Sequence, residues 1–468
     1  MKQNYLKSTI AIAAILLAAS IHAFSQSGAK SLISEKNVRA EMGFLASDAM
    51  QGRGSGTGYE RIAAEYIGSQ FYQFGLEPAG EPGWDGKPTY VQTVNINRGS
   101  FAENPWLKYG STQLEHGKEM IVLRANMGQI SGSLQKLNLG DKPAAGAAVL
   151  VRISGDAPQT LNQSLQAFLA AGASMVIVEE TTQYRAGWAN SATRKPSFST
   201  LGATAKAAAT IVVSHEVAAA IAGLPDGTKL EFGGTLAPAQ VTNTWDAMGK
   251  ITGSDPALAS EVILLTSHLD HLGVRANAPG DDKIFNGADD DASGSVAVLE
   301  MARIIGSGRK PKRTVYFVCF GSEESGGAGA TWFVNNMPFP KDKLVANLEF
   351  EMLGRPDDKV KPEELWLTGY ERSNLGPELA KRGAKLVKDP HPEQNFFQRS
   401  DNIQLARAGV IAHTVSSFGL HKDYHQASDE IKTIDFVHMT RSINSMVAPV
   451  QWLINSNFKP AWNPGGKP

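Results

Sequence analysis

Residues 262–267 read Val-Ile-Leu-Leu-Thr-Ser, a short apolar run that predicts a buried β-strand, and His268 follows it directly. Apolar strands and amphipathic helices alternate after it. The expected helices cover 295–305 and 330–336, and the expected strands cover 314–321 and 344–352. This alternation is typical of a sheet with helices on both faces. The sequence therefore predicts an α/β fold, a three-layer α/β/α sandwich with a mixed, largely parallel central sheet.

The segment between residues 98 and 244 differs from this pattern. It is rich in Ala and Gly and carries short β-type runs at 148–153, 174–179 and 209–214. We therefore expect a small separate α/β domain at 98–244. It would be inserted between two parts of the main domain, at 26–97 and 245–468.

The N-terminus has the pattern of a secretory signal peptide over residues 1–25. Lys2 and Lys7 precede an apolar run from Ile10 to Ala19, and small residues follow it near Ala23. The run holds roughly 10 residues where a membrane span needs about 20. The sequence therefore predicts an exported protein, periplasmic or extracellular, without a stable membrane anchor.

The overall charge names no polyanionic partner. The chain has 45 basic and 46 acidic residues, a formal net charge of -1. No broad basic field favours nucleic acid or an anionic membrane surface. The one cysteine, Cys319, lies in an apolar stretch at 315–320, so we expect a buried structural thiol and no intramolecular disulfide.

Five polar clusters follow one another along the chain, most of them at or just after a buried apolar segment, and open α/β sheets place ligand sites where their strands end. Each cluster alone also fits a solvated turn or a helix cap. Together they predict a metal site with oxygen and nitrogen ligands, which favours zinc, with cobalt or manganese as alternatives. The clusters cover Ser267–His271, Asn286–Gly294, Gly321–Gly327, Asn347–Gly354 and Asp423–Glu430.

The residue types in these clusters suit hydrolysis. A carboxylate such as Asp270 beside His268 is typical of an imidazole oriented for metal binding. The side chains of the adjacent Glu323 and Glu324 diverge, so one can bind metal while the other acts as general base. Three adjacent aspartates at 289–291 repel one another, a cost that a cation or a helix N-terminus offsets.

The order of these motifs resembles a known family. Between His268 and His425 the chain reads His-x-Asp, Gly-Ala-Asp-Asp-Asp-Ala-Ser-Gly, Glu-Glu, Glu-Met-Leu-Gly and Tyr-His. This resembles peptidase family M28, the co-catalytic zinc metallopeptidases that include bacterial double-zinc aminopeptidases. The segment Asp48–Pro78, which opens with Asp-Ala-Met-Gln-Gly-Arg, is similar to the family's N-terminal portion. Residues 98–244 resemble the protease-associated domain inserted in several members.

The resemblance implies two Zn²⁺ ions per chain. It assigns His268 and Glu351 to one zinc and Glu324 and His425 to the other, with Asp290 bridging both. Glu351 departs from the family pattern, because many relatives have Asp at this position. Both are hard carboxylates, so we expect metal binding to persist.

The resemblance also implies three catalytic roles. Glu323 would be the general base, Asp270 would orient His268, and Tyr424 would donate to the developing oxyanion. Residues 400–402 read Ser-Asp-Asn where related sequences often read Ser-Asp-His, so we leave this segment out of the catalytic set.

The implied activity is hydrolysis of the N-terminal peptide bond of peptides with a free N-terminus. A carboxypeptidase or dipeptidase of the same fold would share the metal site. Glutaminyl cyclases share the fold with one zinc, and a receptor-like, non-catalytic binding protein is the alternative outside enzymes. The sequence leaves the preferred first residue and the oligomeric state open.

Overall fold

The computed structural model describes residues 32–153, 161–201 and 208–468. The chain divides into two compact units, one made of the residues up to Gln92 and from Trp245 onward, the other of Thr93–Thr244. Strands β2 (Val91–Ser100) and β12 (Gln240–Ile251) carry the chain across the two boundaries. The predicted signal peptide lies outside the described residues. Within the described part, no helix is long and apolar enough to span a bilayer.

A mixed sheet forms the centre of the first unit. Its strand order is β19-β18-β20-β17-β13-β16-β12, and β1 also pairs with β12. Strand β13 lies parallel to β16 and β17, and β17 lies parallel to β20, whereas β12 and β18 run antiparallel to their neighbours β16 and β20. These strands are β1 (Glu77–Pro78), β13 (Val262–His268), β16 (Thr314–Phe320), β17 (Leu344–Phe350), β18 (Leu365–Leu367), β19 (Leu386–Lys388) and β20 (Ala412–Ser416).

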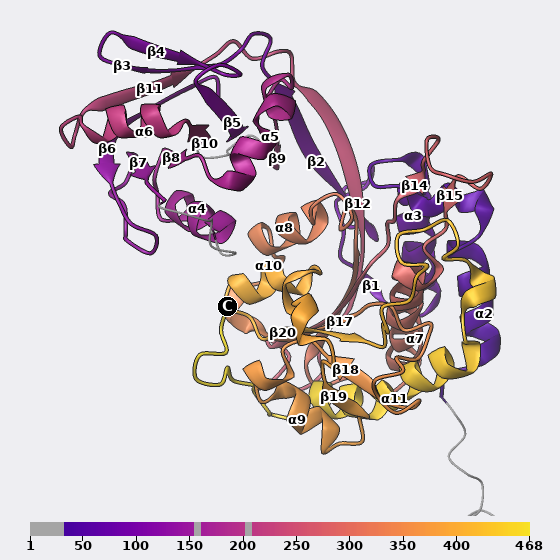
Figure 1. Cartoon of the computed structure of the whole chain (residues 1–468). Coiled ribbons are helices and arrows are strands. Elements are labelled where there is room, and N and C mark those ends of the chain that lie inside the picture. The colour runs from indigo at the N-terminus through magenta and orange to yellow at the C-terminus, as the bar shows by residue number, and fades with distance from the viewer. Residues whose placement is uncertain (1–31, 154–160, 202–207) are drawn as a thin grey trace, which may run out of the picture. The chain divides into compact units, whose positions relative to one another are not determined.

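Helices cover both faces of this sheet, because successive strand residues point to opposite sides. In β13, Ile263 and Leu265 pack in the core shared with α2, α3, α7 and α11, whereas Val262 and Leu264 pack with α8 and α10. Figure 1 shows α8 and α10 on one side of the sheet and α2, α3 and α7 on the other. The predicted α/β/α sandwich is confirmed. The helices are α2 (Glu35–Leu45), α3 (Gly58–Gln73), α7 (Gly294–Gly306), α8 (Ala328–Asn335), α9 (Leu375–Ala380), α10 (Asn402–Arg407) and α11 (Phe436–Asn455).

The expected elements of the main sheet match the observed ones within two residues at each end. The helix expected at 295–305 is α7, and the one expected at 330–336 is α8. The strands expected at 314–321 and 344–352 are β16 and β17. A short antiparallel pair, β14 (Gly273–Val274) with β15 (Ile284–Phe285), lies between β13 and α7 in the sequence.

The second unit is an α/β unit of its own. Its sheet has the order β4-β3-β11-β6-β7-β8-β10-β5, in which β6, β7, β8 and β10 are parallel. Strand β9 pairs with β2. Its identification as a protease-associated domain stays a prediction. The elements are β3 (Trp106–Tyr109), β4 (Thr112–Glu115), β5 (Met120–Ala125), β6 (Gln129–Lys136), β7 (Ala147–Val151), α4 (Leu161–Ala170), β8 (Met175–Glu179), α5 (Thr182–Ala192), β9 (Ser197–Leu201), β10 (Ala209–Val213), α6 (His215–Ala222) and β11 (Lys229–Gly233).

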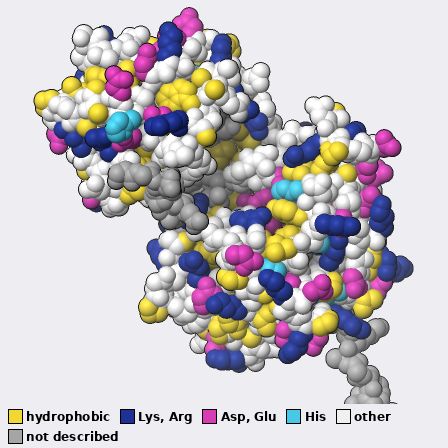
Figure 2. Space-filling view, in the orientation of Figure 1, with side chains coloured by type: hydrophobic (Ala, Val, Ile, Leu, Met, Phe, Trp, Pro, Cys, Tyr) yellow, Lys and Arg dark blue, Asp and Glu magenta, His cyan; other side chains and the backbone are white. Residues whose placement is uncertain are grey.

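The surface charge and the single cysteine can be compared with the sequence analysis. On the face shown in Figure 2, basic and acidic side chains are interspersed and no large area of one sign forms. Cys319 lies in β16 with no exposed surface, and burial raises its pKa to about 12. The predicted buried structural thiol is confirmed.

One buried histidine of the fold titrates far from its usual range. His413 in β20 is fully buried, with Nδ1 2.7 Å from the carbonyl oxygen of Thr368 and Nε2 2.7 Å from Oγ of Ser373. A neutral ring suits both partners, because Nδ1–H donates to the carbonyl and Nε2 accepts from the hydroxyl. Burial lowers the pKa of His413 from 6.5 to about 4.

This shift predicts acid sensitivity. The folded pKa lies below the unfolded one, so the unfolded chain takes up a proton first as the pH falls. The stability that the buried neutral ring of His413 contributes is fully present above pH 6.5 and is lost between pH 6.5 and about 4. His413→Gln should remove this contribution, which amounts to about 3 kcal/mol at most. Urea unfolding at pH 7 and pH 4 should therefore show a smaller pH dependence for the variant, and equal dependences would contradict the assignment.

Candidate metal centre

Donor side chains from five segments of the first unit meet at the carboxyl edge of its parallel strands. His268 is the last residue of β13, Glu351 directly follows β17, and Glu324 lies four residues after the end of β16. Asp290 lies in the turn at 288–293 that precedes α7, and His425 follows β20 in the sequence. The fold thus brings together the five residues that the resemblance assigned to metal.

The first donor group consists of His268, Asp290 and Glu351. One donor atom from each residue lies within 4.8 Å of the other two. Nε2 of His268 is 3.1 Å from Oδ1 of Asp290. Two of the three side chains are buried, so the group is closed to bulk water on most sides.

The second donor group contains the other oxygen of the same aspartate. Nε2 of His425 lies 3.2 Å from Oδ2 of Asp290 and 3.2 Å from Oε2 of Glu324. Asp290 therefore faces both groups, one with each carboxylate oxygen. This is the arrangement expected of a bridging ligand, and it differs from what an isolated acidic loop would show.

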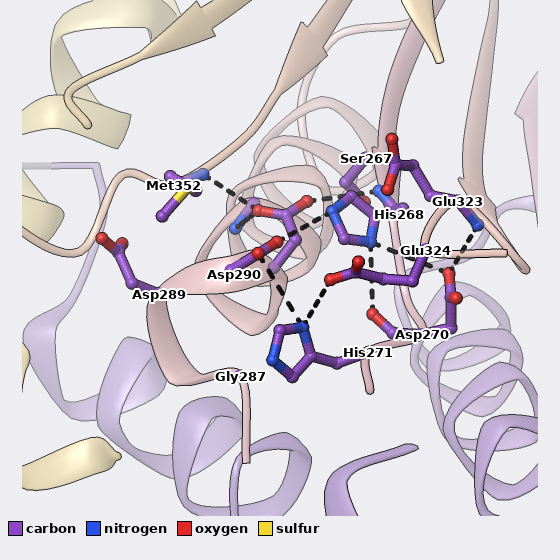
Figure 3. Close-up of polar contacts among 12 residues, drawn as sticks. Ser267, His268, Asp270, His271, Gly287, Asp289, Asp290, Glu323, Glu324 and Met352 are labelled. Atoms are coloured by element: carbon purple, nitrogen blue, oxygen red, sulfur yellow. Dashed lines mark hydrogen bonds and ion pairs between the residues drawn. The ribbon is translucent and has the colours of Figure 1, made fainter. Parts of the chain in front are cut away.

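A second histidine, which the sequence analysis did not single out, also enters this group. Nδ1 of His271 lies 2.8 Å from Oε1 of Glu324 and 3.9 Å from Oδ2 of Asp290. Figure 3 shows the carboxylates of Asp290 and Glu324 between the rings of His268 and His271. The only sequence signal is the repeat of histidine in His-Leu-Asp-His, which also fits a polar turn.

The donor atoms fit a bound cation better than they fit each other. Among the described side chains, Nε2 of His268, both ring nitrogens of His271 and Oε1 of Glu324 are buried without a hydrogen-bond partner. They contact one another at 2.8 to 3.9 Å without hydrogen-bond geometry. Buried polar atoms are normally satisfied. Imidazole and carboxylate donors directed at shared points are what zinc requires.

The charges of the site favour the same reading. Burial and the neighbouring carboxylates of Asp290 and Glu324 raise the pKa of Glu351 to about 7, although His268 opposes them. Burial also disfavours the charged form of Asp290, but hydrogen bonds from His268 and His425 outweigh it and hold its pKa well below the usual range. Hydrogen bonds from the imidazoles of His268 and His425 thus offset the negative charge of Asp290.

The three adjacent aspartates have different tasks. Asp291 accepts hydrogen bonds from the backbone N–H groups of His268, Gly294 and Met352 at 3.0 to 3.2 Å, and so ties three segments together. Asp289 accepts from the N–H of Gly354 at 2.7 Å and contacts the ring of His421 at 2.9 Å. Only the middle carboxylate is free to face the donor groups.

A further carboxylate fixes the turn that carries Asp290. Asp429, fully buried, accepts from the backbone N–H groups of Asp289 and Asp290 at 3.1 Å. Arg355 reaches Asp429 at 3.5 Å and Asp423 at 2.8 Å. The sequence analysis placed Asp429 in a cluster but gave it no role, since its partners lie about 140 residues earlier in the chain.

Asp270 contacts His268, as the resemblance implied, and also the backbone of Glu323. Nδ1 of His268 lies 3.2 Å from the backbone oxygen of Asp270 and 3.7 Å from its Oδ1. The same Oδ1 accepts from the backbone N–H of Glu323 at 3.0 Å, and Oδ2 accepts from Oγ of Ser55 at 2.5 Å. Asp270 therefore positions the ring and the glutamate segment together.

Glu323 and Tyr424 lie beside the donor groups. Burial and the charges of Glu351 and Glu324 raise the pKa of Glu323 well above its usual range. The ring of Tyr424 stacks on that of His425 with centroids 3.9 Å apart. Its hydroxyl accepts from Nη2 of Arg399 at 3.3 Å, which leaves the hydroxyl proton for another acceptor.

A small cavity borders the first donor group at Glu351. Four of its nine other lining residues are aromatic, and the guanidinium carbon of Arg399 lies 5.0 Å from the ring centre of Phe396. The free space is about 20 Å³, room for about one water. The lining residues are Glu351, Met352, Trp366, Thr368, Phe396, Arg399, Thr414, Ser416, Phe418 and Tyr424.

The N-terminal segment contributes Arg53, whose hydrogen bonds hold the loops that carry the donor groups. Arg53 is 1% exposed and donates to the backbone oxygens of Leu45, Leu269, Asn286 and Gly287 at 2.6 to 3.0 Å. It thus links the segment after β13 to the turn before α7. The residue lies in the Asp-Ala-Met-Gln-Gly-Arg motif, so its burial explains why that motif accompanies the metal-binding motifs.

The three-layer fold and the two donor groups define an α/β/α protein with a candidate metal centre at the carboxyl edge of its sheet. Residues 246–449 match the family model described as peptidase family M28. This match confirms the resemblance to peptidase family M28 noted in the sequence.

Two individual relatives show how far the similarity extends. The chain is 26% identical over 219 residues to leupeptin-inactivating enzyme 1 of Streptomyces exfoliatus, a match that covers 44% of this chain and 47% of the relative. It is 32% identical over 119 residues to an aminopeptidase of Pseudomonas aeruginosa, covering 25% of this chain and 19% of the relative. The matches thus span less than half of these relatives' own length.

A solved structure shares the fold along most of the chain. The aminopeptidase from Aneurinibacillus sp. strain AM-1 superposes with a TM-score of 0.50 and 17% identity, over 91% of this chain and 95% of that protein. At this identity the likeness establishes the fold.

The contacts of Arg53 predict a large loss of stability when it is replaced. Arg53→Met leaves four carbonyl oxygens without their buried donor, and an unsatisfied buried group costs about 1–3 kcal/mol. The free energy of unfolding in urea should therefore fall by about 3 kcal/mol or more. Arg61→Met is the matched control, because Arg61 is exposed and its only ion pair, with Glu65, spans 3.7 Å. Similar losses in both variants would contradict this role.

Proposed function

We propose that this protein is an exported, zinc-dependent aminopeptidase that removes the first residue from peptides. The observation that carries the proposal is the pair of donor groups that share one aspartate and lie beside the buried carboxyl of Glu323. The residues that would hold two zinc ions are His268, Asp290 and Glu351 for the first, and Asp290, Glu324 and His425 for the second.

Peptide hydrolysis needs a deprotonated water and a polarised carbonyl. Two bound zinc ions supply the positive charge that lowers the pKa of the attacking water and polarises the carbonyl. Glu323 accepts the proton of the water and delivers it to the leaving amine. Asp270 holds the backbone of Glu323 for this transfer, and the free hydroxyl proton of Tyr424 is directed to the developing oxyanion.

The charge around the site favours binding of a free α-amino group. Carboxylates are the natural partners of an ammonium group, and Glu323 lies beside the donor groups as a carboxylate that is not assigned to zinc. None of the five sequence clusters contains Lys or Arg to capture a C-terminal carboxylate. This supports an exopeptidase that reads the N-terminus.

Three loop arginines are the candidates for the opposite direction. Arg355 is engaged by Asp423, and Arg372 donates to the backbone oxygen of Gly466. Arg399 lines the cavity beside Glu351. A carboxypeptidase or dipeptidase would therefore use Arg399 to hold the substrate carboxylate, and this remains the alternative that the substrate test addresses.

The location of the protein, the direction of cleavage and the alternative without activity complete the proposal. The signal-peptide pattern at residues 1–25 supports a periplasmic or extracellular location. The relatives named as aminopeptidases support the direction of cleavage. A receptor-like binding protein that lacks activity is opposed by the presence of all five ligand candidates together with Glu323.

The general-base role predicts a separation of chemistry from metal binding. Glu323→Gln keeps the shape of the side chain but cannot accept a proton, so turnover should fall about 100-fold or more. The zinc content should stay at that of the wild type. Glu324→Gln is the matched control, since loss of a ligand should lower the zinc content measured by mass spectrometry. Zinc loss in the Glu323 variant instead would reverse the two assignments.

The proposed cleavage from the N-terminus predicts which blocked peptides are hydrolysed. On zinc-loaded protein, a short peptide and its C-terminal amide should both be hydrolysed, whereas the N-acetylated peptide should remain intact. Liquid chromatography with mass spectrometry identifies the released residue. Hydrolysis of the acetylated peptide but not of the amide would replace the aminopeptidase with a carboxypeptidase, and no hydrolysis across a peptide library would favour the receptor-like protein.

A further inference from the structure

The ring of His271 has no ordinary structural explanation. The side chain has no exposed surface, and neither ring nitrogen has a hydrogen-bond partner. His413 is equally buried, but its two ring nitrogens contact Ser373 and Thr368. An unsatisfied buried imidazole costs stability unless a ligand completes it.

One of the two nitrogens, Nδ1, points at the second donor group. Nδ1 of His271 faces the same two carboxylates as Nε2 of His425, at 2.8 Å from Glu324 and 3.9 Å from Asp290. Donors about 2.0–2.1 Å from a tetrahedral zinc lie about 3.3 Å from one another. The two distances from Nδ1 of His271, 2.8 and 3.9 Å, lie on either side of that value.

The surroundings hold the ring in this orientation. A Cβ atom at Gly287 would lie 2.4 Å from Cγ of His271 and 2.6 Å from Cδ2, so the ring packs directly against the glycine backbone. The N–H of His271 donates to the backbone oxygen of Arg53, and its own oxygen accepts from the N–H of Ser55. The imidazole is therefore fixed before any metal binds.

We propose that His271 is a further ligand of the second zinc ion, through Nδ1. The inference rests on the proposed zinc centre and adds a residue to it. The second site would then have four protein donors, namely His271, Asp290, Glu324 and His425, and the first site only three.

This difference makes the two sites unequal. Sites with four protein donors are closed, whereas three donors leave a position for water or substrate. The second site should retain its zinc more tightly, and the first should exchange zinc more readily. His271 would thus divide the centre into a site that holds its ion and a site that keeps an open position.

The direct test counts imidazoles in the wild-type protein. Zinc-edge X-ray absorption on the two-zinc protein should show three imidazole nitrogens for two zinc ions. Two imidazoles for two zinc ions would overturn the role of His271 and leave the proposed function standing. A chain that binds no zinc would overturn both, so the two failures are distinguishable.

Variants separate a ligand from a hydrogen-bond partner of Glu324. In a chelator competition, His271→Ala should weaken the tighter of the two zinc sites by more than about 100-fold, beyond the range of 10–100-fold typical of an outer partner. His271→Asn retains a donor near the Nδ1 position and should not restore the affinity. Restoration by His271→Asn would overturn the proposal.

The matched control is His413→Gln, which replaces an equally buried histidine that contacts no donor group. Both of its zinc affinities should equal those of the wild type. A similar loss in this control would show that removing any buried histidine weakens the centre, and that result would also overturn the assignment of His271.

Discussion

Buried negative charge around Asp290 is the constraint on which the centre depends. Asp270, Asp290 and Asp291 have almost no exposed surface and lie near one another, so their mutual repulsion acts in a medium that screens it weakly. Such charges persist only when donors or cations compensate them. The chain provides both, and the position of each compensating group accounts for the shape of the surrounding loops.

Backbone N–H groups supply the first part of that compensation. Asp291 takes three of them and Asp429 takes those of two consecutive residues, so loops from distant parts of the chain are held by the carboxylates that they stabilise. Arg53 supplies a permanent positive charge. Burial lowers its pKa, but the charges of Asp270 and Asp291 raise it, and its donors are all bound to carbonyl oxygens. The remaining deficit is concentrated where the imidazoles and carboxylates converge, and a pair of divalent cations fits it.

The sequence predicted the parts of this arrangement that depend on local pattern. Apolar runs and their periodicity specify β13, β16 and α7, and strand ends bring His268 and the Glu323–Glu324 pair to one edge of the sheet. His271, Arg53 and Asp429 could not be assigned in this way. Their roles depend on contacts with segments far away in the sequence, such as Gly287 for the ring of His271. The same holds for the three adjacent aspartates, which are identical in type and differ only in which N–H groups surround them.

Glu349 shows why alternation along a strand does not by itself define a ligand. It lies two residues before Glu351, on the same face of the extended chain, yet it contacts α10 rather than the donor groups. Its Oε2 accepts the backbone N–H of Asn402 at 2.5 Å, and burial together with the charge of Glu351 raises its pKa to about 8. The contact uses the main chain of Asn402, while the side-chain amide donates to the backbone oxygen of Phe397. The hydrogen bond to Glu349 therefore does not depend on the side chain at position 402.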